Sequence, residues 1–184
     1  MKKIWLFVAA ILVAVGSVFS TAAEYKPADI YVGLRDQVLR LTPDKLGSHG
    51  KGPVLAVLME TGLRKAVVTV LATADGSASI YYSNGRGTIG AGRRPKGKTA
   101  ALAMIESAKG YVSKATPTKD FPLPKQGSTR FYIVTPSGTL TMEANADDLA
   151  RNKHEFAPLF QKGNELRDTI RAIEKEGGAV SVRP

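Results

Sequence analysis

The sequence predicts an α+β fold in which one mostly antiparallel sheet packs against helices. Short apolar runs separated by turn signals predict a three-stranded meander over residues 54–83, and a second pair of runs predicts a hairpin over residues 129–144. Apolar residues at helical spacing predict helices near residues 99–114 and 155–176. Helices that are interleaved with antiparallel hairpins are typical of the α+β class.

The first element is a short helix over residues 30–41, whose apolar positions recur every three or four residues. These positions are Ile30, Leu34, Val38 and Leu41. Residues 47–53 are rich in glycine and predict a flexible connector. Residues 24–53 are therefore expected to form a lead-in to the α+β domain at 54–176.

The strands of the meander begin with continuous apolar runs at 54–59 and 66–72, which predict burial on both faces. Asp75-Gly76 predicts a tight turn before the return strand. The last helix carries an apolar face from Phe156 to Ile173, typical of a core contact. Two glycines end that helix and leave residues 177–184 as a tail.

Composition limits the classes of function. The chain has 184 residues, with 26 Lys+Arg against 16 Asp+Glu, a formal net charge of +10 and no cysteine. That length suits one domain with one hydrophobic core. The lack of cysteine excludes disulfides, thiolate metal sites and a cysteine nucleophile. His49 and His154 lie far apart in the sequence, so we expect no histidine metal site, and we expect no cofactor.

The first 23 residues are typical of a secretory signal peptide. Lys2-Lys3 precede an apolar run at residues 4–15, and the small residues Thr21 and Ala23 occupy the positions that a signal peptidase requires. The alternative is an uncleaved N-terminal membrane anchor. Since the lysines stay on the inner side in either case, we expect the domain to lie outside the cytoplasm, in the periplasm or secreted.

Residues 83–98 are predicted to be a long basic loop. They contain five glycines and five cations but no acidic residue. Two nucleotide-binding patterns occur there: Gly85-x-Gly87-x-x-Gly90 matches the dinucleotide fingerprint, and residues 92–99 match the P-loop. The first match lacks the parallel βαβ unit that the fingerprint needs. The second contains Pro95, which has no backbone N–H to offer a phosphate.

A simpler interpretation of this loop is an anion-binding surface. Glycines allow backbone N–H groups to turn toward a ligand, and the following helix start adds positive potential. Such a site suits the phosphates or carboxylates of an envelope polymer, a lipid head group or an acidic protein. The other interpretation is a loop with solvated cations. The candidate residues are Gly85, Arg86, Gly87, Gly90, Gly92, Arg93, Arg94, Lys96, Lys98 and Thr99.

Elsewhere the sequence shows no catalytic motif. It has no Gly-x-Ser-x-Gly pattern, and His154-Glu155 is not followed by the second histidine of a zinc protease motif. The adjacent Asp147 and Asp148 precede a predicted helix, where acidic residues favour capping. We therefore expect a protein that is not an enzyme.

Several motifs are distributed along the chain. They are Leu34-Arg35 with Val38-Leu39, Leu41-Thr42-Pro43, residues 57–62, residues 74–83 with the glycines 85, 87, 90 and 92, Thr116-Pro117, Phe121-Pro122-Leu123-Pro124 with Gly127, Arg130-Phe131-Tyr132, and Pro158-Leu159-Phe160 with Gly163 and Glu165. Together they resemble a bacterial protein family of unknown function. The resemblance covers about residues 34–171 and implies one compact α+β domain with no established activity. The basic residues at 93–98 depart from that family, whose loop is rich in glycine but not strongly basic. The order of elements is also similar to that of profilin-like or roadblock-like modules.

Together these observations favour an exported binding or interaction domain that contacts an anionic envelope component or an acidic partner through its basic loop. One alternative is a nucleotide-dependent enzyme or hydrolase that uses residues 92–99. Another is a structural or oligomeric cell-envelope protein. No nucleic acid partner is expected, because aromatic residues are not interleaved with the cations. Contact with a membrane is expected only through the N-terminal segment, if that segment is not cleaved.

Overall fold

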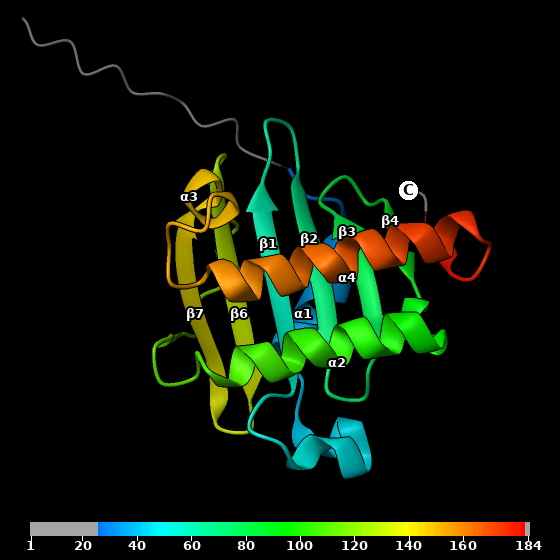
Figure 1. Cartoon of the computed structure of the whole chain (residues 1–184), viewed down its shortest axis with the longest axis horizontal. Coiled ribbons are helices and arrows are strands. Elements are labelled where there is room, and N and C mark those ends of the chain that lie inside the picture. The colour runs from blue at the N-terminus through cyan, green and yellow to red at the C-terminus, as the bar shows by residue number, and fades with distance from the viewer. Residues whose placement is uncertain (1–25, 183–184) are drawn as a thin grey trace, which may run out of the picture.

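One eight-stranded antiparallel sheet forms the centre of the domain. The computed structural model describes residues 26–182, and in it the strands follow the order β5-β7-β6-β1-β2-β3-β4-β8 (Figure 1). The α+β class predicted from the sequence is therefore confirmed. The strands are β1 (Ala56–Gly62), β2 (Val67–Thr73), β3 (Ala78–Tyr82), β4 (Gly87–Ile89), β5 (Thr116–Pro117), β6 (Ser128–Thr135), β7 (Gly138–Asn145) and β8 (Val180–Val182).

Strand pairing follows the local signals in the sequence. β1, β2 and β3 form the expected meander, and β6 and β7 form the expected hairpin. The two units join where β1 pairs with β6, so that Val57 lies between Ala72 and Ile133. Both faces of β1 and β2 are buried within the domain, which accounts for the continuous apolar runs of these strands.

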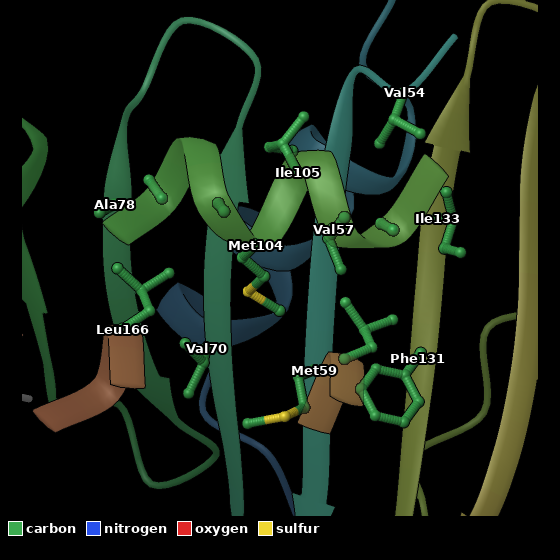
Figure 2. Close-up of a cluster of buried hydrophobic side chains, with 14 of the residues drawn as sticks. Val54, Val57, Met59, Val70, Ala78, Met104, Ile105, Phe131, Ile133 and Leu166 are labelled. Carbon is green, nitrogen blue, oxygen red and sulfur yellow. The ribbon is translucent and has the colours of Figure 1, made fainter. Parts of the chain in front are cut away.

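Helices α2 (Pro95–Lys109) and α4 (Ala157–Lys175) cover one face of the sheet (Figure 1). Their apolar faces meet strand side chains such as Met59, Val70 and Phe131 in the larger core (Figure 2). Gly163 lets α4 approach β1 closely, since a Cβ atom there would lie 2.4 Å from the sulfur of Met59. Burying each large apolar side chain contributes about 1.5–3 kcal/mol.

The opposite face of the sheet is covered by α1 (Asp29–Leu39), and here the sequence prediction was wrong in its details. Ile30 was assigned to the apolar stripe but is 45% exposed, while Tyr31, Arg35 and Leu39 are the buried residues. Two of these are polar and find partners on the sheet, which apolar periodicity does not reveal. These contacts pack α1 against the sheet.

Several segments that were predicted to be irregular are ordered. The supposed flexible connector forms 3-10 turns over η1 (Pro43–Lys51), and a short helix α3 (Ala146–Ala150) follows β7. The tail contains β8, which pairs with β4. The predicted signal segment, residues 1–23, lies outside the described residues. Within 26–182, none of the helices has both the length and the apolar character that crossing a bilayer requires.

Candidate functional site

The basic stretch at 83–98 is folded into the domain, so its prediction as a long loop was wrong. It comprises a turn after β3, strand β4, a 3-10 turn η2 (Ala91–Arg93) and the first turn of α2, which begins at Pro95 and not at Thr99. Gly85 and Gly90 have φ values of 86° and 79°, which lets them make the turns on either side of β4. Pairing of β4 with β8 from the end of the chain holds this segment in place.

The other glycines of this segment allow backbones to pack closely. A Cβ atom on Gly92 would lie 2.2 Å from the carbonyl oxygen of Gly76, and one on Gly97 would lie 2.2 Å from that of Ala91. A Cβ atom on Gly87 would lie 2.6 Å from the carbonyl oxygen of Ile80. These glycines are thus explained by contacts within the domain.

The geometry also differs from that of a nucleotide-binding loop. The backbone N–H groups of Arg93, Arg94 and Lys98 donate to carbonyls of the chain itself, and Pro95 has no N–H. The P-loop match is therefore a match of sequence alone. The glycines of the dinucleotide pattern lie before, in and after β4, which is antiparallel to β3, whereas that fingerprint lies in a parallel βαβ unit.

The five cations of this segment point to different surroundings. The ammonium of Lys96 lies 2.7 Å from each carboxylate oxygen of Glu176, so this cation has an acidic partner from outside the stretch. The Lys98 side chain lies over Gly76 on the turn between β2 and β3. The Arg94 guanidinium lies against Gly178, just after α4. Thr99 is exposed on the first turns of α2.

Arg86 lines the pocket that we consider the candidate site. It is a hollow of about 490 Å³ between β3, β4 and β8 and the second half of α4. Figure 1 shows that half of α4 beside β4. Ile80 and Val182 supply apolar lining. The polar lining consists of Tyr82, Arg86, Thr88, Arg171, Glu174 and Ser181.

Two arginines dominate the electrostatics of this pocket. Arg171 donates from Nη2 to the hydroxyl of Tyr82 at 3.1 Å. This hydrogen bond, with Asp168 and Glu174 nearby, raises the pKa of Arg171 above its ordinary value. Within residues 26–182 neither Arg86 nor Arg171 takes part in a salt bridge, although Glu174 also lines the pocket. The pocket therefore offers two cations and three hydroxyls against one carboxylate, an arrangement that suits an anionic group which also carries a hydrogen-bond donor.

Most of this pocket was missed by sequence reasoning. Only Arg86 and Gly87 of the predicted site residues line it. Arg171 lies 85 positions after Arg86 in the sequence, on the outer side of a helix where a lone arginine is ordinary. Its proximity to Tyr82 depends on how α4 crosses the sheet, so no local pattern could have indicated it. Another, smaller hollow of about 310 Å³ beside Arg93 brings together two serines and a single cation.

The other candidate residues have structural surroundings. Asn145 accepts hydrogen bonds from the backbone N–H groups of Asp147 and Asp148, which lie in the first turn of α3. His154 Nδ1 accepts from the N–H of Phe156 at 3.3 Å just before α4. His49 is exposed in η1. Among the described residues no group of three or more His, Asp or Glu side chains is placed to hold a metal ion.

Comparison of the chain with protein-family models, with curated proteins and with solved structures finds no match. The resemblance drawn from the sequence motifs therefore stays a prediction.

Proposed function

We propose that this protein is an exported binding module that holds an anionic oxygen group, a carboxylate or a phosphate, between Arg86 and Arg171. One observation carries the proposal: two arginines from distant parts of the chain, neither of them in a salt bridge among the described residues, line the same 490 Å³ hollow. Charge-assisted hydrogen bonds from arginine to such groups are among the strongest that a protein surface offers. Export follows from the predicted signal segment.

The pocket supports recognition of one group at the end or side of a larger molecule. The hydroxyls of Thr88 and Ser181 lie on the neighbouring strands β4 and β8, within reach of oxygens that the arginines hold. Glu174 at the same pocket favours ligands whose anion is flanked by a hydroxyl, amide or amine. Envelope polymers rich in uronic acid or phosphodiester groups have this chemistry.

The test is a binding titration of the protein with two probes, polygalacturonate for carboxylates and polyphosphate for phosphates, at several salt concentrations. Arg86→Gln and Arg171→Gln are each expected to weaken binding of the preferred probe about 10- to 150-fold, because a hydrogen bond to a charged group contributes about 1.5–3 kcal/mol. The matched control is Arg151→Gln, which removes the same charge from an exposed position after α3.

The pattern of losses decides the outcome. Weaker binding by both Arg86→Gln and Arg171→Gln, with unchanged binding by Arg151→Gln, supports the proposal. The probe that binds more tightly then identifies the class of anion. Equal weakening by all three substitutions indicates attraction by net charge and refutes the pocket. Undiminished binding by Arg171→Gln refutes it as well.

A further inference from the structure

One end of the sheet presents exposed apolar side chains beside the place where the described chain begins. The tip between β1 and β2 carries Leu63, which is 44% exposed, followed by exposed Arg64 and Lys65. The N–H of Ala28 donates to the carbonyl of Ser83 at 2.8 Å, and the N–H of Ser83 donates to the carbonyl of Val67 at 2.9 Å. Since Val67 is the first residue of β2, the start of α1 lies at the same end as the tip (Figure 1).

The apolar residues at this end are unusual for the domain. Five large hydrophobic side chains are exposed among residues 26–182, and three of them are Leu63, Ile30 and Val32. The last two lie in the first turn of α1, with exposed fractions of 45% and 47%. Exposed apolar residues gathered in one region mark an interaction surface more often than scattered ones do.

Four exposed cations lie at the same end of the domain as these apolar residues. Lys125 belongs to the same end, because the N–H of Gly127 donates to the carbonyl of Gly62 at 2.9 Å. Lys26, Arg64, Lys65 and Lys125 are all exposed, and none of them has a salt bridge within the described part of the chain. Asp29 is the acidic residue of the adjoining turn of α1.

The neighbouring helix α3 adds charges of both signs. Its first turn carries Asp147 and Asp148, and exposed Arg151 and Lys153 follow within five residues. These four charges sum to zero. The excess of positive charge at this end therefore comes from the four cations around the tip.

The sequence before Lys26 indicates which surface this end of the domain faces. An apolar run occupies residues 4–15, and only ten residues, 16–25, separate it from Lys26. Ten residues of fully extended chain span at most about 33–36 Å. If the run stays in a bilayer, the domain remains within that distance of the lipid head groups. Its entry point, and the tip beside it, are then the parts nearest to the lipid.

We propose that this end of the domain docks on an anionic lipid surface. Leu63 and Ile30 enter the head-group region, while Arg64 and Lys65 lie against lipid phosphates. Basic residues beside exposed apolar ones suit such a surface, which attracts each Lys or Arg and accepts shallow apolar insertion. The proposal rests on the export segment remaining attached to the domain, and it is independent of the pocket around Arg171.

The experiment uses the full chain reconstituted in vesicles, either of phosphatidylcholine alone or with phosphatidylglycerol. Because the chain contains no cysteine, Leu63→Cys and Ser137→Cys each place one environment-sensitive fluorophore. Ser137 is exposed in the turn between β6 and β7, at the opposite end of the sheet. We expect a blue-shifted emission at position 63 only, and only when phosphatidylglycerol is present.

Charge variants test the role of the tip. Removing Arg64 and Lys65 by Arg64→Gln and Lys65→Gln is expected to lower the docking equilibrium about fivefold for each cation. The matched control, Lys45→Gln with Lys51→Gln, removes two exposed lysines from η1 and is expected to leave docking unchanged. Arg171→Gln should also leave it unchanged, so failure of the pocket proposal and failure of this one are distinguishable.

Three results would overturn the proposal. The first is equal emission from the labels at positions 63 and 137. The second is a shift at position 63 that does not depend on phosphatidylglycerol. The third is a shift that grows with the protein density in the vesicles and not with lipid charge, since that result assigns the surface to a second copy of this chain.

Discussion

The ion pair between Arg35 on α1 and Glu60 on β1 gives the sharpest prediction for stability. Glu60 is fully buried, and the Arg35 side chain is 11% exposed. The guanidinium donates twice, from Nε to Oε1 at 2.7 Å and from Nη2 to Oε2 at 2.9 Å. Its carbon Cζ lies 5.2 Å from the ring centre of Tyr132. The perturbation is Glu60→Gln, which keeps the shape of the side chain and removes its charge.

The size of the effect follows from this geometry. Burial lowers the pKa of Arg35, but the hydrogen bonds and charge of Glu60 outweigh burial and raise it. Glu60→Gln removes that compensation, and the guanidinium stays charged because arginine does not lose its proton in proteins. A Gln amide can accept one of the two hydrogen bonds and turns its NH₂ group toward a second donor. Removing one partner of a buried pair costs about 3–5 kcal/mol. That is a large part of the roughly 5–15 kcal/mol that stabilises a typical domain.

The assay is urea unfolding followed by far-UV circular dichroism. The matched control is Glu143→Gln, which breaks the ion pair with Arg130 on the sheet surface, where the two side chains are 19% and 31% exposed. Its expected cost is below about 1 kcal/mol. The double substitution Arg35→Met with Glu60→Leu should recover most of the loss, because apolar residues of similar volume replace buried ion pairs at little cost.

A loss below about 1 kcal/mol for Glu60→Gln would show that water reaches Arg35, and it would refute the reasoning from an uncompensated buried charge. The reasoning also fails if the double substitution is as unstable as the single one. In that case the loss comes from altered packing of α1 and not from charge.

Two further predictions concern glycines and acid stability. Gly97→Ala should lower the free energy of unfolding by about 1–3 kcal/mol, because the new methyl group meets the carbonyl oxygen of Ala91 at 2.2 Å. Gly33→Ala, on the open face of α1, should raise the free energy of unfolding by about 0.5–1 kcal/mol. Thermal melts in which both substitutions shift the melting temperature equally would contradict both expectations. Burial raises the pKa of Asp75, but hydrogen bonds from Thr73 and Ser77 outweigh it and hold that pKa below its ordinary value of 3.8. Asp75 therefore contributes stability that is present above pH 3.8 and lost as pH falls through the lowered pKa, so unfolding curves of Asp75→Asn and of the unaltered protein should differ near neutral pH and converge in acid. A gap that stays constant with pH would show that Asp75 acts through packing alone.

The strands and long helices were predictable because their signals are local. Alternating turn signals and apolar runs place β1, β2 and β3, and the stripe from Phe156 to Ile173 places α4. The buried residues of α1 were not predictable in the same way. Arg35 is buried because Glu60 lies opposite it on the sheet, and nothing in the sequence near Arg35 reveals that partner.

The sequence by itself thus determined the fold class, the meander, the hairpin and the long helices, since these depend on turn chemistry and periodicity within short windows. Only the tertiary structure decided what the basic stretch at 83–98 does. Its glycines serve close packing, Lys96 pairs with Glu176, and Arg86 lines a pocket together with Arg171 and residues of β8. Each of these outcomes depends on partners about 80 or more residues away, or on backbones brought into contact by the sheet. Local patterns carry no record of such pairings, because they form only when the chain has folded.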